Sequence, residues 1–406
     1  MSADAIRGRI KNLPPLPLVA HKLLTLMKQD DCSANDVTKI LCSDQTLAGK
    51  VLKLANSSFY GMSGQVGSVS RAVVILGFSA IRSMALGLGM AQAIQTASHG
   101  LDLAYFWRHA LFTAGAARTV AVETGGVDPE EVFVAGLVHD LGRLVLEMVT
   151  PGLRTHMASV SSDKLLQTET ELAGMSHTKA GQQVMRHWKL PEGLVQMARF
   201  HHHETSFRSD HTGLIAYVQL GELMARSLGH SEEPPALDPA PEALAAHVGL
   251  SLVTTADLLA RTCQEVSRTR AFLEISGVDV EYEDPLAHLE PEAADPSATG
   301  TAVYLGTDPE RAGWVHGLLE LQAWAVVPMR AFLAGDGGAV DLAILDPRSI
   351  STGQAAKLRT ILAERGTRIC TLGPAAELAE VVGKAAELPV AFCRDELLAL
   401  RDSVPA

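Results

Sequence analysis

The sequence lacks the features of an extracellular, membrane-spanning or nucleic-acid-binding protein. Its five cysteines are scattered and form no Cys-x-x-Cys pair, which argues against a disulfide framework and fits a reducing compartment. It contains no run of about 18 apolar residues and no apolar signal-peptide core at its start, so no membrane span is expected. The net charge is −12 and no long basic run exists, which disfavours phosphate-backbone binding. We expect a cytoplasmic protein without direct nucleic-acid contacts.

The composition indicates a helical protein with more than one domain. A chain of 406 residues is too long for one ordinary core, so two or three domains are expected. Apolar residues make up 47% of the chain but aromatic residues only 5%. Such a balance is typical of a globular, Ala/Leu-rich and helical protein.

Apolar residues recur at helical spacing from residue 13 to residue 275. The pattern predicts short helices before residue 95, followed by helices over 107–123, 130–148, 164–172, 177–188, 214–228 and 255–273. The helix expected over 130–148 is apolar but carries His139 and Asp140 side by side. A buried charge is costly unless it is paired or bound to a metal, so this pair suggests a metal site or a polar network.

The pattern changes near residue 280. Residues 281–300 are acidic, rich in Pro and Ala and without periodicity, which predicts a linker. Beyond it, short apolar runs alternate with helical stretches, and strands are expected at 302–305, 324–327, 340–345, 368–372 and 388–392. Strands interleaved with helices predict a small parallel α/β sheet over 301–406.

Several motifs of the first 280 residues resemble the HDOD domain, the bacterial "HD-related output domain". They are LPPLP at 13–17, SDQTLA at 43–48, LKLANS at 52–57, AVVILG at 72–77, FWRH at 106–109, the His-Asp segment 135–142, G-x-x-H-x-x-x-G at 174–181, W-x-L-P at 188–191, and the histidines at 201 and 202. The resemblance implies an all-α HD-like domain over 1–280, with subdomains at 10–98 and 99–280, and a role in signalling.

The same resemblance implies a set of metal ligands. HD-superfamily hydrolases bind metal through a first His, the His-Asp pair and a later Asp, and two-metal members add further histidines. The matching positions are His109, His139, Asp140, His177, His201, His202 and Glu222, with Glu in place of the later Asp. Imidazole and carboxylate ligands suit one or two ions of Fe, Mn or Zn.

Other polar residues near these motifs have simpler explanations beside the functional ones. Glu169 either supports a ligand or lies on a solvated face, and Lys179 is a candidate phosphate contact. Arg143 could meet a phosphate, but helix-end arginines more often serve the helix dipole or an ion pair. We expect His187 at the surface and His203 outside the site.

The C-terminal part resembles a response-regulator receiver domain, with a flavodoxin-like α/β fold. The run DLAILD at 341–346 places Asp346 at the phospho-acceptor position. A receiver needs carboxylates for Mg²⁺ and a lysine for the phosphoryl group. Here only Asp308 follows the first strand and no lysine follows the fifth, so the domain is expected to be degenerate and Asp346 inactive.

Two classes of function follow from these resemblances. The first is a signal-transduction protein whose HDOD domain binds a signalling partner or a small ligand such as a cyclic nucleotide; a homodimer is compatible with it. The second is a metal-dependent phosphohydrolase acting on a nucleotide or cyclic dinucleotide. The Gly-Tyr-Pro signature of cyclic-di-GMP phosphodiesterases is missing, since the chain reads HHHETSFRSDHTG at 201–213, and few basic residues are available for phosphate. We therefore favour a non-catalytic regulator.

Overall fold

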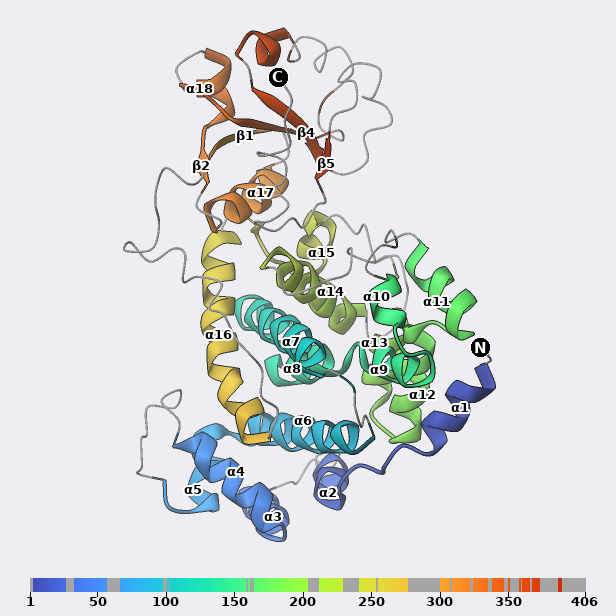
Figure 1. The fold of residues 1–406 in the computed structure, drawn as a ribbon. Coiled ribbons are helices and arrows are strands. Elements are labelled where there is room, and N and C mark those ends of the chain that lie inside the picture. The colour runs from blue at the N-terminus through green and yellow to red at the C-terminus, as the bar shows by residue number, and fades with distance from the viewer. Residues whose placement is uncertain are drawn as a thin grey trace. The chain divides into compact units, whose positions relative to one another are not determined.

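The computed structural model describes residues 3–26, 33–56, 66–97, 101, 103–157, 160, 164–203, 212–228, 241–252, 255–276, 300–306, 309–321, 324–334, 338–346, 350, 358, 360–365, 367–372 and 386–388 (Figure 1). The chain divides into two compact units. The first comprises Met1–Glu222, Ser231–Leu237 and Gln264–Tyr282, and the second comprises Leu223–His230, Asp238–Cys263 and Glu283–Ala406. The expected domain boundary at residue 280 stays a prediction. Except for Gly300, the expected linker lies outside the described residues.

The described part of the chain up to residue 276 is helical, as the apolar periodicity predicts. No helix in this or any other described range combines the length and apolar character needed to cross a membrane. The helices are α1 (Ala3–Lys11), α2 (Leu18–Leu26), α3 (Ala34–Cys42), α4 (Gln45–Ala55), α5 (Val69–Leu76), α6 (Phe78–Ala97), α7 (Ala104–Thr124), α8 (Pro129–Val138), α9 (Leu141–Val149), α10 (Leu153–Met157), α11 (Leu165–Ala173), α12 (His177–His187), α13 (Glu192–Phe200), α14 (Thr212–Ser227), α15 (Pro241–Val248) and α16 (Thr255–Ser276).

Local sequence signals account for several helix starts. The Ser33, Ser68 and Ser176 hydroxyls each accept a hydrogen bond from the backbone N–H three residues ahead, at the starts of α3, α5 and α12. Asp128 caps α8 and is followed by a proline at the first helical position, where no backbone donor is needed. These caps fix where the helices begin, and therefore which residue of α12 comes first: His177.

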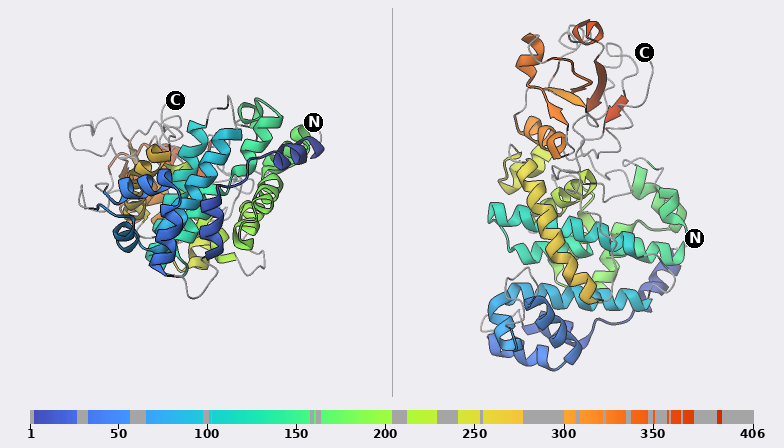
Figure 2. Two further views of the ribbon diagram at one scale, coloured as in Figure 1. Left: turned by 90° about the horizontal axis from the view of Figure 1, so that it is seen from below. Right: turned by 60° about the vertical axis from the view of Figure 1, so that its left-hand side comes forward.

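Small residues let the helices of the first unit approach closely. Helices α7 and α8 pack side by side, and α12 packs on both α9 and α13 (Figures 1 and 2). A Cβ on Gly136 of α8 would lie 2.7 Å from the Cα of Ala114 on α7, and one on Gly142 of α9 would lie 1.9 Å from the carbonyl oxygen of His177. The first contact joins the backbones of α8 and α7, and the second joins those of α9 and α12.

The helix expected over 130–148 is interrupted at the His-Asp pair. Helix α8 ends at Val138 and α9 begins at Leu141, and Asp140 has φ −100° and ψ 14°. The prediction of one continuous helix was wrong because the His139 ring, through Nδ1, donates to the carbonyl oxygen of Gly136 at 2.7 Å. In an α-helix that oxygen would accept the N–H of Asp140. The ring competes for it, and the chain turns at the pair.

The second unit contains a small parallel sheet. Its strands are β1 (Thr301–Leu305), β2 (Ala325–Val326), β3 (Leu342–Leu345), β4 (Arg368–Leu372) and β5 (Ala386–Leu388), in the order β2-β1-β3-β4-β5 and all parallel. Helices α17 (Pro309–Leu321) and α18 (Met329–Ala334) alternate with the strands. The order is a common one among doubly wound α/β folds. Every residue of β3 is buried, as expected for a parallel strand covered on both faces.

Candidate metal centre

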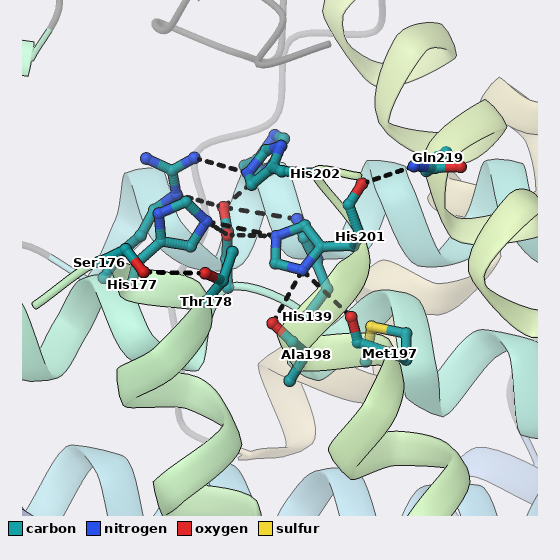
Figure 3. A network of polar contacts seen from close by, with 12 residues as sticks. His139, Ser176, His177, Thr178, Met197, Ala198, His201, His202 and Gln219 are labelled. Atoms are coloured by element: carbon teal, nitrogen blue, oxygen red, sulfur yellow. Dashed lines mark hydrogen bonds and ion pairs between the residues drawn. The ribbon is translucent and has the colours of Figure 1, made fainter. Parts of the chain in front are cut away.

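The fold brings the seven predicted metal ligands together from five parts of the first unit. His109 comes from α7, the His139-Asp140 pair from the turn between α8 and α9, and His177 from the first position of α12. The turn after α13 carries the remaining two histidines (Figure 3), and α14 carries the glutamate. Their donor atoms form two groups, each within 4.8 Å: Asp140, His177, His201 and His202, and His109, His139 and Glu222.

The Asp140 carboxylate belongs to the first group and also lies close to two histidines of the second. Its Oδ1 is 3.5 Å from Nε2 of His177 and 3.4 Å from Nε2 of His201. Its Oδ2 is 3.4 Å from Nε2 of His139 and 3.7 Å from Nε2 of His109. The Asp140 side chain is 3% exposed. One buried carboxylate is therefore shared by imidazoles of both groups.

The ring tautomers follow from the acceptors at Nδ1. The Nδ1 atoms of His139 and His201 each contact a backbone carbonyl oxygen, at 2.7 and 3.1 Å, and Nδ1 of His177 contacts the Glu169 carboxylate at 2.7 Å. Such oxygens can only accept, so Nδ1 carries the hydrogen, and in a neutral ring Nε2 presents a lone pair. Nε2 of His177 and Nε2 of His201 face each other at 3.3 Å. In the neutral rings lone pairs thus face one another and the Asp140 carboxylate.

Three buried side-chain atoms at the centre have no hydrogen bond within the described part of the chain. They are Nε2 of His139, Oδ1 of Asp140 and Nδ1 of His202. Buried polar atoms are normally paired, and each exception calls for a bound group or an ion. Imidazole nitrogens and carboxylate oxygens are also suitable ligands for first-row transition ions. The residues present therefore fit a divalent metal.

The two carboxylates of the centre have opposite pKa shifts. Burial alone would raise the pKa of Asp140, but the Arg143 guanidinium and His139 outweigh it and hold that pKa well below its ordinary value. Burial raises the pKa of Glu222 to about 7, against the opposing influence of His139. Asp140 is thus ionised at neutral pH, whereas Glu222 exchanges a proton near pH 7.

Burial also keeps two of the histidines, His201 and His202, neutral. It lowers the pKa of His201 to about 3 and that of His202 well below its ordinary value. Burial would lower the pKa of His139 as well, but the adjacent Asp140 carboxylate outweighs it and raises that pKa. Neutral imidazole is the form that binds metal ions, so His201 and His202 need lose no proton to do so.

Glu169 holds His177 in place from behind. Its carboxylate accepts the backbone N–H of His177 at 2.8 Å and the ring Nδ1–H at 2.7 Å, and its side chain is only 2% exposed. Burial would raise its pKa, but His177 and Arg143 outweigh this and lower it. Of the two readings of Glu169, the supporting one agrees with this geometry, because the side chain does not lie on a solvated face.

The remaining candidates lie around the centre in different ways. Arg143 donates to Asp140 Oδ2 at 2.6 Å and lies 3.7 Å from Glu169, so it makes the ion pairs expected of a helix-end arginine. Lys179 and His187 are exposed on α12, and His203 is partly buried. Sequence reasoning missed Gln219 of α14, which donates to the backbone oxygens of residues 201 and 203 at 2.9 and 2.6 Å (Figure 3). The only feature of the sequence that pointed to Gln219 was a polar residue within an otherwise apolar helix.

The helices and their buried His/Asp cluster define a mostly helical, HDOD-like domain. Residues 13–204 match the HDOD domain family, so this part of the chain is an HDOD domain, as the motifs predict. An uncharacterized protein from Treponema pallidum (strain Nichols) is 24% identical over 230 residues, which cover 56% of this chain and 44% of that protein.

Two solved structures share the fold. One, from Marinobacter aquaeolei VT8, has a name that refers to signal transduction; it matches with a TM-score of 0.53 at 24% identity, over 68% of this chain and 65% of that chain. An HDOD domain protein of unknown function from Geobacter sulfurreducens matches with a TM-score of 0.51 at 22% identity, over 68% of this chain and 95% of that chain. At these identities the likeness concerns the fold alone. This chain spans under half of the Treponema protein and under two thirds of the Marinobacter chain.

Proposed function

We propose that the protein is a signal-transduction regulator whose HDOD domain holds one or two divalent ions, iron, manganese or zinc, at the buried His/Asp centre. The ligands are the seven residues of the two groups described above. The domain acts by binding a signalling protein or a small ligand, and the metal fixes the arrangement of the helices that carry the ligands. A homodimer is compatible with this role. The name of the Marinobacter structure supports the signalling assignment.

One observation carries the metal assignment. Lone pairs of His177 and His201 point at each other and at the ionised Asp140 carboxylate, inside a site from which water is nearly excluded. Acceptors that face acceptors in a buried site repel one another unless a cation lies between them. A divalent ion satisfies all of them at once.

The test is the metal content of protein purified without an affinity tag. We expect stoichiometric iron, manganese or zinc in the wild-type protein by elemental mass spectrometry, and its loss in Asp140→Ala. The matched control is His187→Ala, because this histidine is exposed on the same helix as His177. Metal-free wild-type protein after incubation with each ion, or equal metal in Asp140→Ala, would remove the proposal.

A metal-dependent phosphohydrolase is the second candidate. The observation that favours it is the position of Asp140, shared between two adjacent ligand groups. When bound, paired divalent ions supply an activated water and neutralise phosphate charge. The protein's own residues shield the ligands from water and orient them. Glu169 does this by accepting the backbone N–H of His177, and Gln219 by donating to the backbone oxygen of His201. Hydrolysis of nucleotides or cyclic dinucleotides above the Asp140→Ala background would establish it; no turnover by metal-loaded protein would leave the binding role.

For the second unit we propose a degenerate receiver. The strand order β2-β1-β3-β4-β5 supports this, as does the position of Asp346 at the carboxyl end of β3. The stretches that would carry the acidic partner at 308 and the missing lysine after β5 lie outside the described residues. The inactivity of Asp346 as a phospho-acceptor is argued below from its own contacts.

A further inference from the structure

The second unit contains a buried group of charges around Asp346, and the inference drawn from it rests on the degenerate receiver proposed above. Asp346 follows β3 and is completely buried. Its Oδ2 accepts a hydrogen bond from the hydroxyl of Tyr304 on β1 at 2.8 Å, and its Oδ1 accepts one from the guanidinium of Arg311 on α17 at 3.0 Å. Both carboxylate oxygens are therefore occupied by groups of the protein itself.

The same guanidinium has a second carboxylate partner. The other terminal nitrogen of Arg311 contacts the carboxylate of Glu242 on α15. The Arg311 side chain is 3% exposed and that of Glu242 is 20% exposed. Helix α15 packs against α17 within the second unit. One arginine thus joins a helix that precedes the expected linker to the sheet that follows it.

Arginine is the residue that such a junction requires. Its planar guanidinium offers donors in two directions and stays charged when buried, whereas a lysine ammonium is a point charge that shifts its pKa readily. Two carboxylates share one cation, so removal of the arginine would leave both without it in a poorly solvated place. Breaking a buried pair by removing one partner is strongly destabilising.

We propose that Arg311 is an intramolecular latch that holds α15 against the α/β sheet. By pairing with Asp346, it also prevents that carboxylate from accepting a phosphoryl group or a metal ion. The Asp346 carboxylate at the carboxyl end of β3 thus pairs with a segment of the same chain. It therefore binds neither a phosphoryl group nor a free metal ion. Glu242 closes the latch from the helix side, and Tyr304 with Asp346 holds it on the sheet side.

The first test is backbone hydrogen exchange of the full-length protein. Glu242→Gln removes the charge that Arg311 holds on α15 and is partly exposed, so the chain tolerates it. We expect amides of α15 to exchange about tenfold faster, the effect of losing one hydrogen bond to a charged group. Glu320→Gln, the same change at an exposed glutamate of α17, should leave α15 unchanged. Exchange in Glu242→Gln within twofold of the wild-type rate would overturn the latch.

The second test addresses the closure of Asp346. Full-length protein is incubated with acetyl phosphate and Mg²⁺, and its intact mass is measured. We expect no phosphoryl addition to the wild-type chain. A phosphoryl group on the wild-type protein that is absent from Asp346→Asn would show that the carboxylate is open, and would contradict the closure.

Discussion

Replacement of Gly142 by alanine tests how closely the metal centre depends on helix packing. A Cβ at this position would lie 1.9 Å from the carbonyl oxygen of His177 and 2.6 Å from the backbone nitrogen of Gly181. Both obstacles are backbone atoms of α12, so no side-chain rotation relieves the clash. Overpacking of a tight core costs typically about 1–3 kcal/mol. Because both obstructing atoms are backbone atoms, we expect Gly142→Ala to lose about 3 kcal/mol of unfolding free energy.

Gly181 on α12 provides the control from the opposite side of the same contact. A Cβ there would meet its nearest atom, the backbone nitrogen of Gly142, at 3.4 Å, an ordinary contact. Because alanine is the better helix former by about 1 kcal/mol, Gly181→Ala should be neutral or slightly stabilising. Urea denaturation of both variants, prepared free of metal, measures the difference. If Gly142→Ala is no less stable than Gly181→Ala, the backbone contact between α9 and α12 does not exist as described.

Two further predictions concern paired charges of the first unit. Glu169→Ala should lose about 3 kcal/mol, because it leaves two buried N–H groups of His177 and a nearby Arg143 without their carboxylate, whereas Glu169→Gln should lose less. The pKa of Glu169 in the folded chain lies below its ordinary value of 4.5. The stability that ionised Glu169 contributes is therefore complete above pH 4.5 and is lost as the pH falls through the folded pKa. Denaturation curves of the wild type and of Glu169→Gln should converge below pH 4.5. Arg118→Met should cost about 2 kcal/mol in urea denaturation, because Arg118 bridges Glu130 at 2.6 Å and Glu265 at 2.5 Å; equal stability of variant and wild type would contradict this ion-pair network.

The helices of the first unit and most of the candidate ligands could be predicted from sequence because their signals are local. Apolar periodicity and caps such as Ser176 predict where helices lie, and the motifs give the positions of the histidines. The turn at His139 could not be predicted, because the apolar pattern runs through it unbroken. The competition for the Gly136 carbonyl depends on a side-chain rotamer that the pattern does not contain. That turn lets both members of the pair face the centre, which neighbours on one helix, about 100° apart, would not do.

Arginines that pair with two carboxylates are the residues whose partners could not be predicted from the sequence. A carboxylate inside an apolar unit predicts that a cation must be close, because an unpaired buried charge is costly. It does not predict which cation, since a single arginine leaves no periodic signature and its partners are chosen by tertiary contact. Arg118 meets Glu265 across 147 positions, and Arg311 meets Glu242 across 69. In both cases one guanidinium holds two carboxylates, so each arginine fixes the relation of two elements that local sequence patterns treat as independent.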